Sequence, residues 1–284
     1  MRLTDMSYAH EVMARHGIAP KKKFGQNFLT SDAVVARIAD TPCEDSDVGV
    51  LEIGPGIGTL TEALAERYKK VVSVEIDESL LPVLAETVGF RDNVEIVNGD
   101  AMKIDFPAFV REHFGDMRVC VCANLPYYIT SPIIMKILEC GALFESVTVM
   151  IQKEVAERLA AAPGSSDYGA ITVFAAYLAE VEKCFNVSPG NFLPQPKVTS
   201  AVIRMKPHKN PPVSVKNPEN LQKIIKAAFE QRRKMLAGAL SAATSKIGKA
   251  AIAEKIAEAG LPADVRGEKL SLADFARLSD ILEI

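Results

Sequence analysis

The sequence predicts an α/β protein with a mostly parallel sheet, followed by a small all-helical C-terminal domain. From about Val48, short apolar runs alternate with longer amphipathic stretches. Runs that are apolar on both faces and separated by helices are typical of a parallel sheet covered on both sides. The composition then changes at Lys206–Pro218, and 284 residues are enough for one large domain and one small one.

The expected strands are short and rich in β-branched residues, and the expected helices lie between them. Two later apolar segments are predicted to add strands at one edge of the sheet. The expected strands are Val48–Ile53, Val71–Ile76, Val94–Val97, Val119–Ala123 and Val147–Ile151, then Ala170–Tyr177 and Ser200–Met205; the expected helices are Thr59–Tyr68, Ser79–Val88 and Ser131–Leu138.

The C-terminal part is predicted to be helical. Lys206–Pro218 contains four prolines and no hydrophobic period, which indicates a linker. Asn217 can cap a helix that has Pro218 in its first turn, and apolar residues keep helical spacing from Leu221 to Leu240. Two more helices are expected near Lys249–Ala259 and Ser271–Leu282, the second with a capping box of Ser271 and Asp274.

Composition excludes several classes of protein. No apolar run reaches the roughly 18 residues of a membrane span, and the polar N-terminus does not resemble a signal peptide. Five cysteines, an odd number, favour reduced thiols and a cytoplasmic protein. Cys120 and Cys122 lie in an apolar strand without a paired ligand motif, so we expect them to be buried rather than to bind metal.

The net charge of −3 hides a strong segregation along the chain. Residues 1–182 carry 16 Lys and Arg against 27 Asp and Glu, whereas residues 183–250 carry 13 against 2. The second stretch thus has a net charge of +11. Such a stretch suits a polyanion such as a nucleic acid, although a solvated basic face that binds nothing would look the same.

A glycine-rich turn predicts a nucleotide-type site. Leu51–Gly58 (LEIGPGIG) ends one strand and opens a helix, and glycines there let the backbone approach a ligand closely. Glu75 ends the next strand and can accept both hydroxyls of a ribose, while Asp100 follows the third strand and can accept from an adenine amino group. A nicotinamide enzyme is the alternative. The fingerprint of such enzymes is GxGxxG, however, whereas Gly54–Gly58 reads GxGxG, and Asp100 would have no evident role in binding a nicotinamide cofactor.

The tetrapeptide after the fourth strand, Asn124-Leu125-Pro126-Tyr127, indicates chemistry on the amino group of a base. That nitrogen is a poor nucleophile because its lone pair is delocalised into the ring. The Asn124 side-chain carbonyl and the Leu125 backbone carbonyl can accept its two hydrogens and favour a tetrahedral nitrogen. Pro126 fixes the loop, and Tyr127 offers a face on which the base can stack. An ordinary Asn–Pro turn is the alternative.

Together these elements resemble the class I S-adenosylmethionine-dependent methyltransferases, with their Rossmann-like fold and seven-stranded sheet. More closely, the chain resembles the small-subunit ribosomal RNA adenine N6-dimethyltransferases from Lys21 to its end. The segments that carry this resemblance are Lys23–Leu29 (KFGQNFL), the glycine turn, Asn124–Tyr127 with Ile129–Pro132, Phe192–Ser200 (FLPQPKVTS), Glu230–Lys234 and Arg266–Ser271.

The resemblance implies S-adenosylmethionine as the cofactor and dimethylation of two adjacent adenines near the 3′ end of small-subunit ribosomal RNA. It implies that residues 1–47 close over the cofactor, that residues 48–208 form the catalytic domain and that residues 209–284 bind RNA. Phe192 would hold the flipped adenine against Tyr127. The implied cofactor contacts are Asn27, Leu29, Gly54, Gly56, Glu75, Asp100 and Asn124.

The chain departs from the family at Met235–Gly238, where a threonine, a leucine and a polar or basic pair are usual. This departure weakens the transfer of RNA contacts onto that helix. The alternatives are a large-subunit adenine methyltransferase of the antibiotic-resistance type, and a ribosome-assembly or transcription factor built on the same fold. We expect a cytoplasmic monomer with ribosomal RNA as its partner and with neither metal nor membrane.

Overall fold

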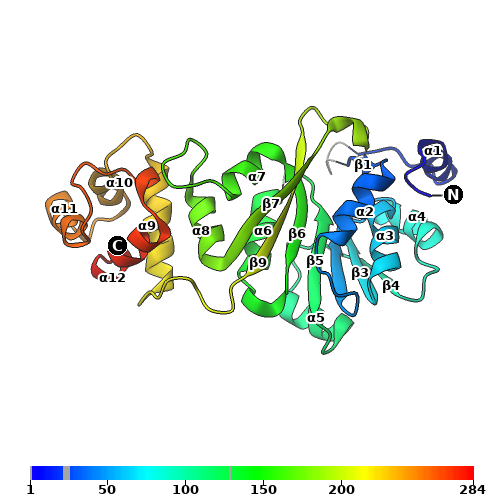
Figure 1. Ribbon diagram of the computed structural model, residues 1–284, viewed down its shortest axis with the longest axis horizontal. Helices are drawn as coiled ribbons and strands as arrows, with labels where there is room; N and C mark the ends of the chain where they lie inside the picture. Colours follow the sequence, from blue (N-terminus) through cyan, green and yellow to red (C-terminus); the bar gives the residue numbers. More distant parts are fainter. Residues whose placement is uncertain (1, 22–25, 128) are drawn as a thin grey trace. The chain divides into compact units, whose positions relative to one another are not determined.

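A seven-stranded sheet dominates the computed structural model, which describes residues 2–21, 26–127 and 129–284 (Figure 1). The strand order is β4-β3-β2-β5-β6-β9-β7; β2 to β6 pair in parallel, and β9 runs antiparallel to β6. The mostly parallel sheet that the sequence predicts is therefore confirmed. Its strands are β2 (Gly49–Ile53), β3 (Lys70–Glu75), β4 (Val94–Asn98), β5 (Val119–Asn124), β6 (Val147–Gln152), β7 (Ala179–Val187) and β9 (Ser200–Pro207).

The strand order reverses beside β2. From β2 the chain proceeds outward through β3 to β4, and it then returns to place β5 on the other side of β2. In open α/β sheets, a crevice forms outside the carboxyl ends of the strands at such a reversal. The ends of β2 and β5 are therefore the place where this fold favours a ligand.

Helices cover the sheet, and the sequence predicted only some of them. The helices α3 and α6 were expected close to their observed bounds, and the expected Ser79–Val88 is a short 3₁₀ turn that leads into α4. Four helices were not predicted: α1, α2, α5 and α7. The bounds are α1 (Met6–Arg15), α2 (Asp32–Asp40), α3 (Thr59–Arg67), α4 (Leu81–Thr87), α5 (Phe106–Phe114), α6 (Thr130–Leu138) and α7 (Lys153–Leu159).

A two-stranded ribbon joins distant parts of the chain. β1 (Phe28–Leu29) pairs antiparallel with β8 (Phe192–Leu193), so that Phe28 lies opposite Leu193 and Leu29 opposite Phe192. A further backbone bond runs from Thr30 N to Asn191 O at 2.9 Å. The ribbon fixes the N-terminal segment beside the loop that leads into β9.

The predicted strand at Ala170–Tyr177 is wrong, because this segment forms helix α8 (Ala170–Leu178). A uniformly apolar run does not distinguish a buried strand from a buried helix. Gly169 begins the helix, and the Thr172 hydroxyl accepts from its N–H at 3.1 Å. The edge strand β7 follows instead, and it was not predicted because it contains the charged residues Glu180, Glu182 and Lys183.

The chain divides into two compact units, Met1–Ala156 with Val181–Pro207, and Glu157–Glu180 with His208–Ile284. The second unit is helical around its own apolar core. Asn217 caps α9 through a bond from Asn220 N, and Ser271 with Asp274 forms the predicted capping box on α12. The unit contains α8, α9 (Pro218–Glu230), α10 (Leu236–Ala243), α11 (Lys249–Glu258) and α12 (Leu272–Ile281).

The apolar period from Leu221 to Leu240 belongs to two helices rather than one. Helix α9 ends at Glu230, and α10 begins at Leu236. Both bury their apolar residues in the same core, which explains why the period continues across the break. None of the described helices is long and apolar enough to cross a membrane.

Candidate functional site

A pocket lies at the carboxyl ends of β2, β3, β4 and β5, where the strand order reverses. Its walls contain every site residue expected from the sequence except Phe192. The expected residues on the walls are Asn27, Leu29, Gly54, Gly56, Glu75, Asp100, Asn124, Leu125, Pro126 and Tyr127.

Glycines shape the floor of the pocket after β2. Gly54 and Gly56 have φ of 71° and 62°, a left-handed conformation that favours glycine. A Cβ on Gly56 would also lie 3.0 Å from the Phe28 ring. The turn ends at Gly58, the N-cap of α3, so the first N–H groups of that helix lie beside the turn.

Glu75 ends β3 as a buried carboxylate that backbone groups hold in place. Its Oε1 accepts from Asp77 N at 2.8 Å, and its Oε2 accepts from Gly56 N at 3.3 Å. Burial raises the pKa of Glu75, although these backbone bonds partly oppose the rise. Glu75 is 4% exposed and lines the pocket.

Glu52 is a second buried carboxylate in the pocket wall, and the sequence analysis did not identify it. Its Oε2 accepts from the hydroxyls of Thr61 at 2.6 Å and Ser73 at 2.7 Å. Complete burial raises the pKa of Glu52 to about 7, despite those two bonds. A glutamate within the apolar run of β2, with hydroxyl residues in neighbouring elements, was the available signal.

The end of β4 contributes Asp100. Its Oδ1 accepts from Met102 N at 2.9 Å, which orients the carboxylate at the turn. Ile76 and Met102 line the same part of the pocket, and Ile76 is 44% exposed. An acceptor with apolar side chains nearby can bind the edge and the faces of an aromatic base.

The end of β5 presents the predicted tetrapeptide. The Asn124 Nδ2 donates to the Asn27 carbonyl at 3.1 Å, which leaves its Oδ1 on the other side of the planar amide. Leu125 N donates to Met150 O at 3.1 Å and anchors the loop to β6. The Tyr127 hydroxyl lies 3.0 Å from Ser200 Oγ, so the ring is held against β9.

Phe192 does not line this pocket. It is 3% exposed, pairs with Leu29 in the β1–β8 ribbon and packs in an apolar cluster with α2 and α3. Its stacking on a base therefore stays a prediction. In the N-terminal motif, Asn27 and Leu29 reach the pocket, whereas Lys23, Phe24 and Gly25 lie outside the described residues.

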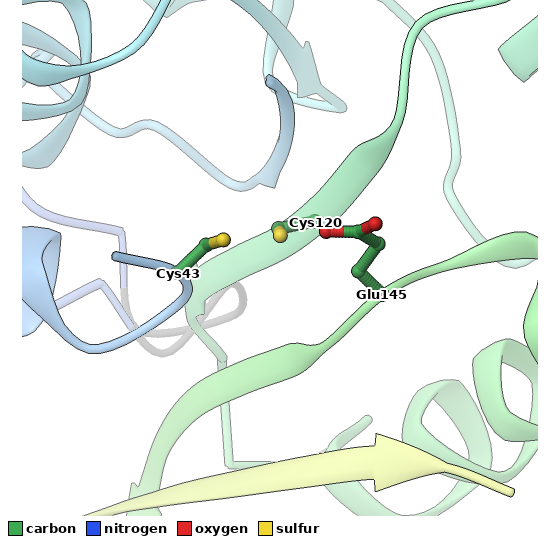
Figure 2. A group of neighbouring side chains, drawn as sticks. All are labelled: Cys43, Cys120 and Glu145. Carbon is green, nitrogen blue, oxygen red and sulfur yellow. The ribbon is translucent and has the colours of Figure 1, made fainter. Parts of the chain in front are cut away.

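A separate group of potential metal ligands lies near the amino end of β5. The sulfur atoms of Cys43 and Cys120 and a carboxylate oxygen of Glu145 lie within 4.8 Å of one another (Figure 2). Burial raises the pKa of Cys120 to about 12, so this thiol stays protonated at neutral pH. Arg118 donates to both oxygens of Glu145, at 3.2 and 3.3 Å. The group thus contains a neutral thiol and an already paired carboxylate, and it lies at the opposite end of β5 from the pocket.

Solved structures identify the fold. The dimethyladenosine transferase of Plasmodium falciparum aligns with a TM-score of 0.74 at 26% identity, covering 88% of this chain and 95% of that one. The 23S rRNA methyltransferase ErmE aligns with a TM-score of 0.68 at 29% identity, covering 90% and 99%. The fold is therefore that of a class I methyltransferase.

The sequence narrows the class to one family. A family model described as ribosomal RNA adenine dimethylase matches residues 18–283, and the chain belongs to that family. Curated relatives include the ribosomal RNA small subunit methyltransferases A of Lachnoclostridium phytofermentans, 46% identical over 99% of this chain and 98% of the relative, and of Streptococcus gordonii, 44% identical over 100% and 99%. The resemblance seen in the sequence is thus confirmed, and the protein is a ribosomal RNA adenine dimethyltransferase.

Proposed function

We propose that the enzyme transfers methyl groups from S-adenosylmethionine to the N6 atoms of two adjacent adenines near the 3′ end of small-subunit ribosomal RNA. The observation that carries the proposal is the single pocket that unites the glycine turn, Glu75, Asp100 and Asn124–Tyr127. The names of the full-length relatives support the small subunit as the target.

The residues of the pocket fit the proposed donor. Glu75 suits the ribose hydroxyls, and Asp100 with Ile76 and Met102 suits the adenine. Thr59 lines the pocket, is 6% exposed, and its hydroxyl is one of the buried polar atoms of the described chain without a hydrogen-bond partner. Such an atom requires a polar group, which the amino acid moiety of the donor would provide. When bound, S-adenosylmethionine supplies an electrophilic methyl group on a positively charged sulfur.

Asn124 and Leu125 would activate the adenine. The Asn124 Oδ1 and the Leu125 carbonyl accept the two hydrogens of the amino group and favour a tetrahedral nitrogen, whose lone pair then points at the methyl group. The nitrogen becomes acidic as its new bond forms, so its proton passes to water without a strong base. Catalysis on this account rests on positioning and on acceptors that stabilise developing positive charge.

The remaining roles concern the RNA. Tyr127 would stack on the adenine, with Phe192 on the opposite face, once the base has left its helix. Residues 1–47 would close over the donor, and residues 209–284 would bind RNA, because residues 209–250 carry 9 Lys and Arg against 2 Asp and Glu. We further propose that the enzyme acts as a monomer in the cytoplasm and that no metal takes part.

The decisive experiment supplies labelled S-adenosylmethionine with unmodified small and large ribosomal subunits and maps the product by mass spectrometry. We expect dimethyladenine at two adjacent positions in small-subunit RNA. Label confined to the large subunit would favour the activity of the ErmE type instead. Association with immature small subunits in the absence of any methyl transfer would indicate a binding factor.

A further inference from the structure

Asp77 is a buried carboxylate two residues beyond Glu75, and the mechanism above gives it no task. It is 5% exposed. Its Oδ1 accepts from Lys21 Nζ at 2.8 Å and from Ser79 Oγ at 2.7 Å, and its Oδ2 accepts from Gln26 Nε2 at 3.1 Å. Burial alone would raise the pKa of Asp77, but the bonds from Lys21, Ser79 and Gln26 outweigh it and lower the pKa. The carboxylate is therefore ionised at neutral pH.

Two of these donors belong to the N-terminal segment of the pocket. Lys21 and Gln26 are also joined to each other, because Lys21 N donates to Gln26 Oε1 at 2.8 Å. Gln26 directly precedes Asn27, whose carbonyl accepts from Asn124 Nδ2 at 3.1 Å. A continuous path of contacts thus runs from Asp77 through Gln26 to the amide of Asn124.

Asp77 also contacts Glu75, a residue that lines the pocket, through its backbone. Its N–H donates to Glu75 Oε1 at 2.8 Å. This bond does not depend on the Asp77 side chain, so a side-chain substitution can separate the two connections. The side chain holds the N-terminal segment, and the backbone orients the carboxylate proposed to bind ribose.

We infer that Asp77 is a positioning residue that holds Lys21 and Gln26 so that the Asn27 carbonyl turns the Asn124 Oδ1 toward the adenine amino group. The inference rests on the proposed roles of Asn124 and Glu75 and adds the residue that aligns them. An amide without a fixed partner on Nδ2 presents its oxygen to the base for only part of the time. Loss of this alignment lowers the rate of methyl transfer more than it lowers donor affinity.

The first test is Asp77→Asn, which keeps the size of the side chain and places an amide donor opposite the donors of Lys21 or Gln26. We expect kcat for methyl transfer to small-subunit RNA to fall by about tenfold or more. We expect the Kd for S-adenosylhomocysteine to change by less than about threefold, because Asp77 does not line the pocket and its backbone bond to Glu75 remains.

The matched control is Asp92→Asn, which changes an exposed carboxylate outside the residues that line the pocket. We expect it to leave both kcat and Kd at wild-type values. Lys21→Met completes a double-mutant cycle with Asp77→Asn. If both residues act through one contact, the double variant loses less than the product of the two single losses.

The outcomes separate this inference from the proposed function. A wild-type enzyme that fails to methylate adenine overturns the proposed function. An active wild type with an unchanged kcat in Asp77→Asn overturns the inference alone. A parallel loss of kcat, donor affinity and thermal stability in Asp77→Asn also overturns it, because the residue would then support the fold in general.

Discussion

Among single residues, Asn124 is proposed to act in methyl transfer and Glu75 in binding the donor. The Asn124 amide is oriented by one bond from Nδ2 to the Asn27 carbonyl, and the Glu75 carboxylate by two backbone N–H groups. Both side chains line the same pocket, yet they come from different strands. Their substitution should therefore affect different kinetic constants.

We predict that Asn124→Ala lowers kcat by about 100-fold or more, the usual effect of removing a group that stabilises developing charge. RNA affinity should change little, because the side chain faces a single amino group.

Glu75→Ala should instead weaken donor binding by about tenfold or more, since bonds to charged groups contribute about 1.5–3 kcal/mol. Single-turnover rates and equilibrium binding distinguish the two, and wild-type turnover in Asn124→Ala would refute the mechanism.

Glu52 gives the fold a dependence on pH. Its pKa is about 7 in the folded protein and near the ordinary 4.5 in the unfolded chain. The folded state therefore holds the proton more strongly, and the contribution to stability present below pH 4.5 is lost as the pH rises to 7. This loss is on the order of 3 kcal/mol.

We predict that Glu52→Gln loses less stability than the wild type between pH 5 and pH 8, because the amide does not ionise. Urea unfolding at both pH values measures the difference. The exposed Asp92→Asn serves as the control and should follow the wild type. An equal loss in Glu52→Gln and wild type would show that this carboxyl does not titrate in that range.

Among the elements, close backbone contacts fix the C-terminal helices. Gly267, in the 3₁₀ turn Gly267–Lys269, lies against α9, and a Cβ there would lie 2.8 Å from the Ala228 Cβ and 2.9 Å from its carbonyl oxygen. Backbone atoms cannot move aside as a flexible side chain can. The absence of a side chain thus sets the distance between the turn and the helix.

We predict that Gly267→Ala destabilises the protein by about 1–3 kcal/mol, the usual result of overpacking. Gly190→Ala is the control, because apart from its chain neighbours no atom lies within 4 Å of a Cβ at that position. Chemical unfolding followed by far-UV circular dichroism compares the two. Equal unfolding midpoints would mean that the turn can shift away from α9 at little cost.

The elements also differ in how well the sequence predicted them. The strands β2, β3, β5 and β6 were expected near their observed bounds because buried parallel strands are almost uniformly apolar, and the half-buried edge strand β4 because it is rich in β-branched residues. The same uniformity made α8 look like a strand, and its neighbours in the core of the helical unit decide its structure. β7 was missed because an edge strand keeps exposed charged residues.

The pocket was predictable wherever a residue lies at the end of a strand or in a motif. Glu52, Thr59 and Asp77 were missed because their roles depend on contacts with distant segments rather than on local spacing. Phe192 packs in an apolar cluster, which its motif did not indicate, and its stacking on the base stays a prediction.

At the scale of the whole molecule, the distribution of charge along the chain is the basis for the proposed RNA-binding surface. The net charge of +11 in residues 183–250 includes exposed cations on and after α9, among them Lys223, Lys226 and Arg233. Phosphate contacts release counterions, so each cation that contacts RNA adds to the salt dependence of binding.

We predict that neutralising Lys223, Lys226 and Arg233 together lowers the slope of log K against log salt by about 2, at about 0.7 per contact with single-stranded RNA. Filter binding over a range of salt concentrations measures the slope. Lys69→Gln, at an exposed cation paired with Asp47, is the control and should leave the slope unchanged. An unchanged slope in the triple variant would place the RNA surface elsewhere.

The β1–β8 ribbon also affects how the protein is made. One strand of the ribbon contains Phe28 and the other contains Leu193. The N-terminal strand of the pocket wall therefore pairs with a strand that is synthesised much later. A nascent chain that ends before β8 already contains the parallel strands β2 to β6 but nothing to pair with β1. Pairing between such distant segments is slow compared with local folding. The ribbon can therefore form only after about two thirds of the 284-residue chain has left the ribosome that makes it, a particle whose small subunit is the proposed substrate.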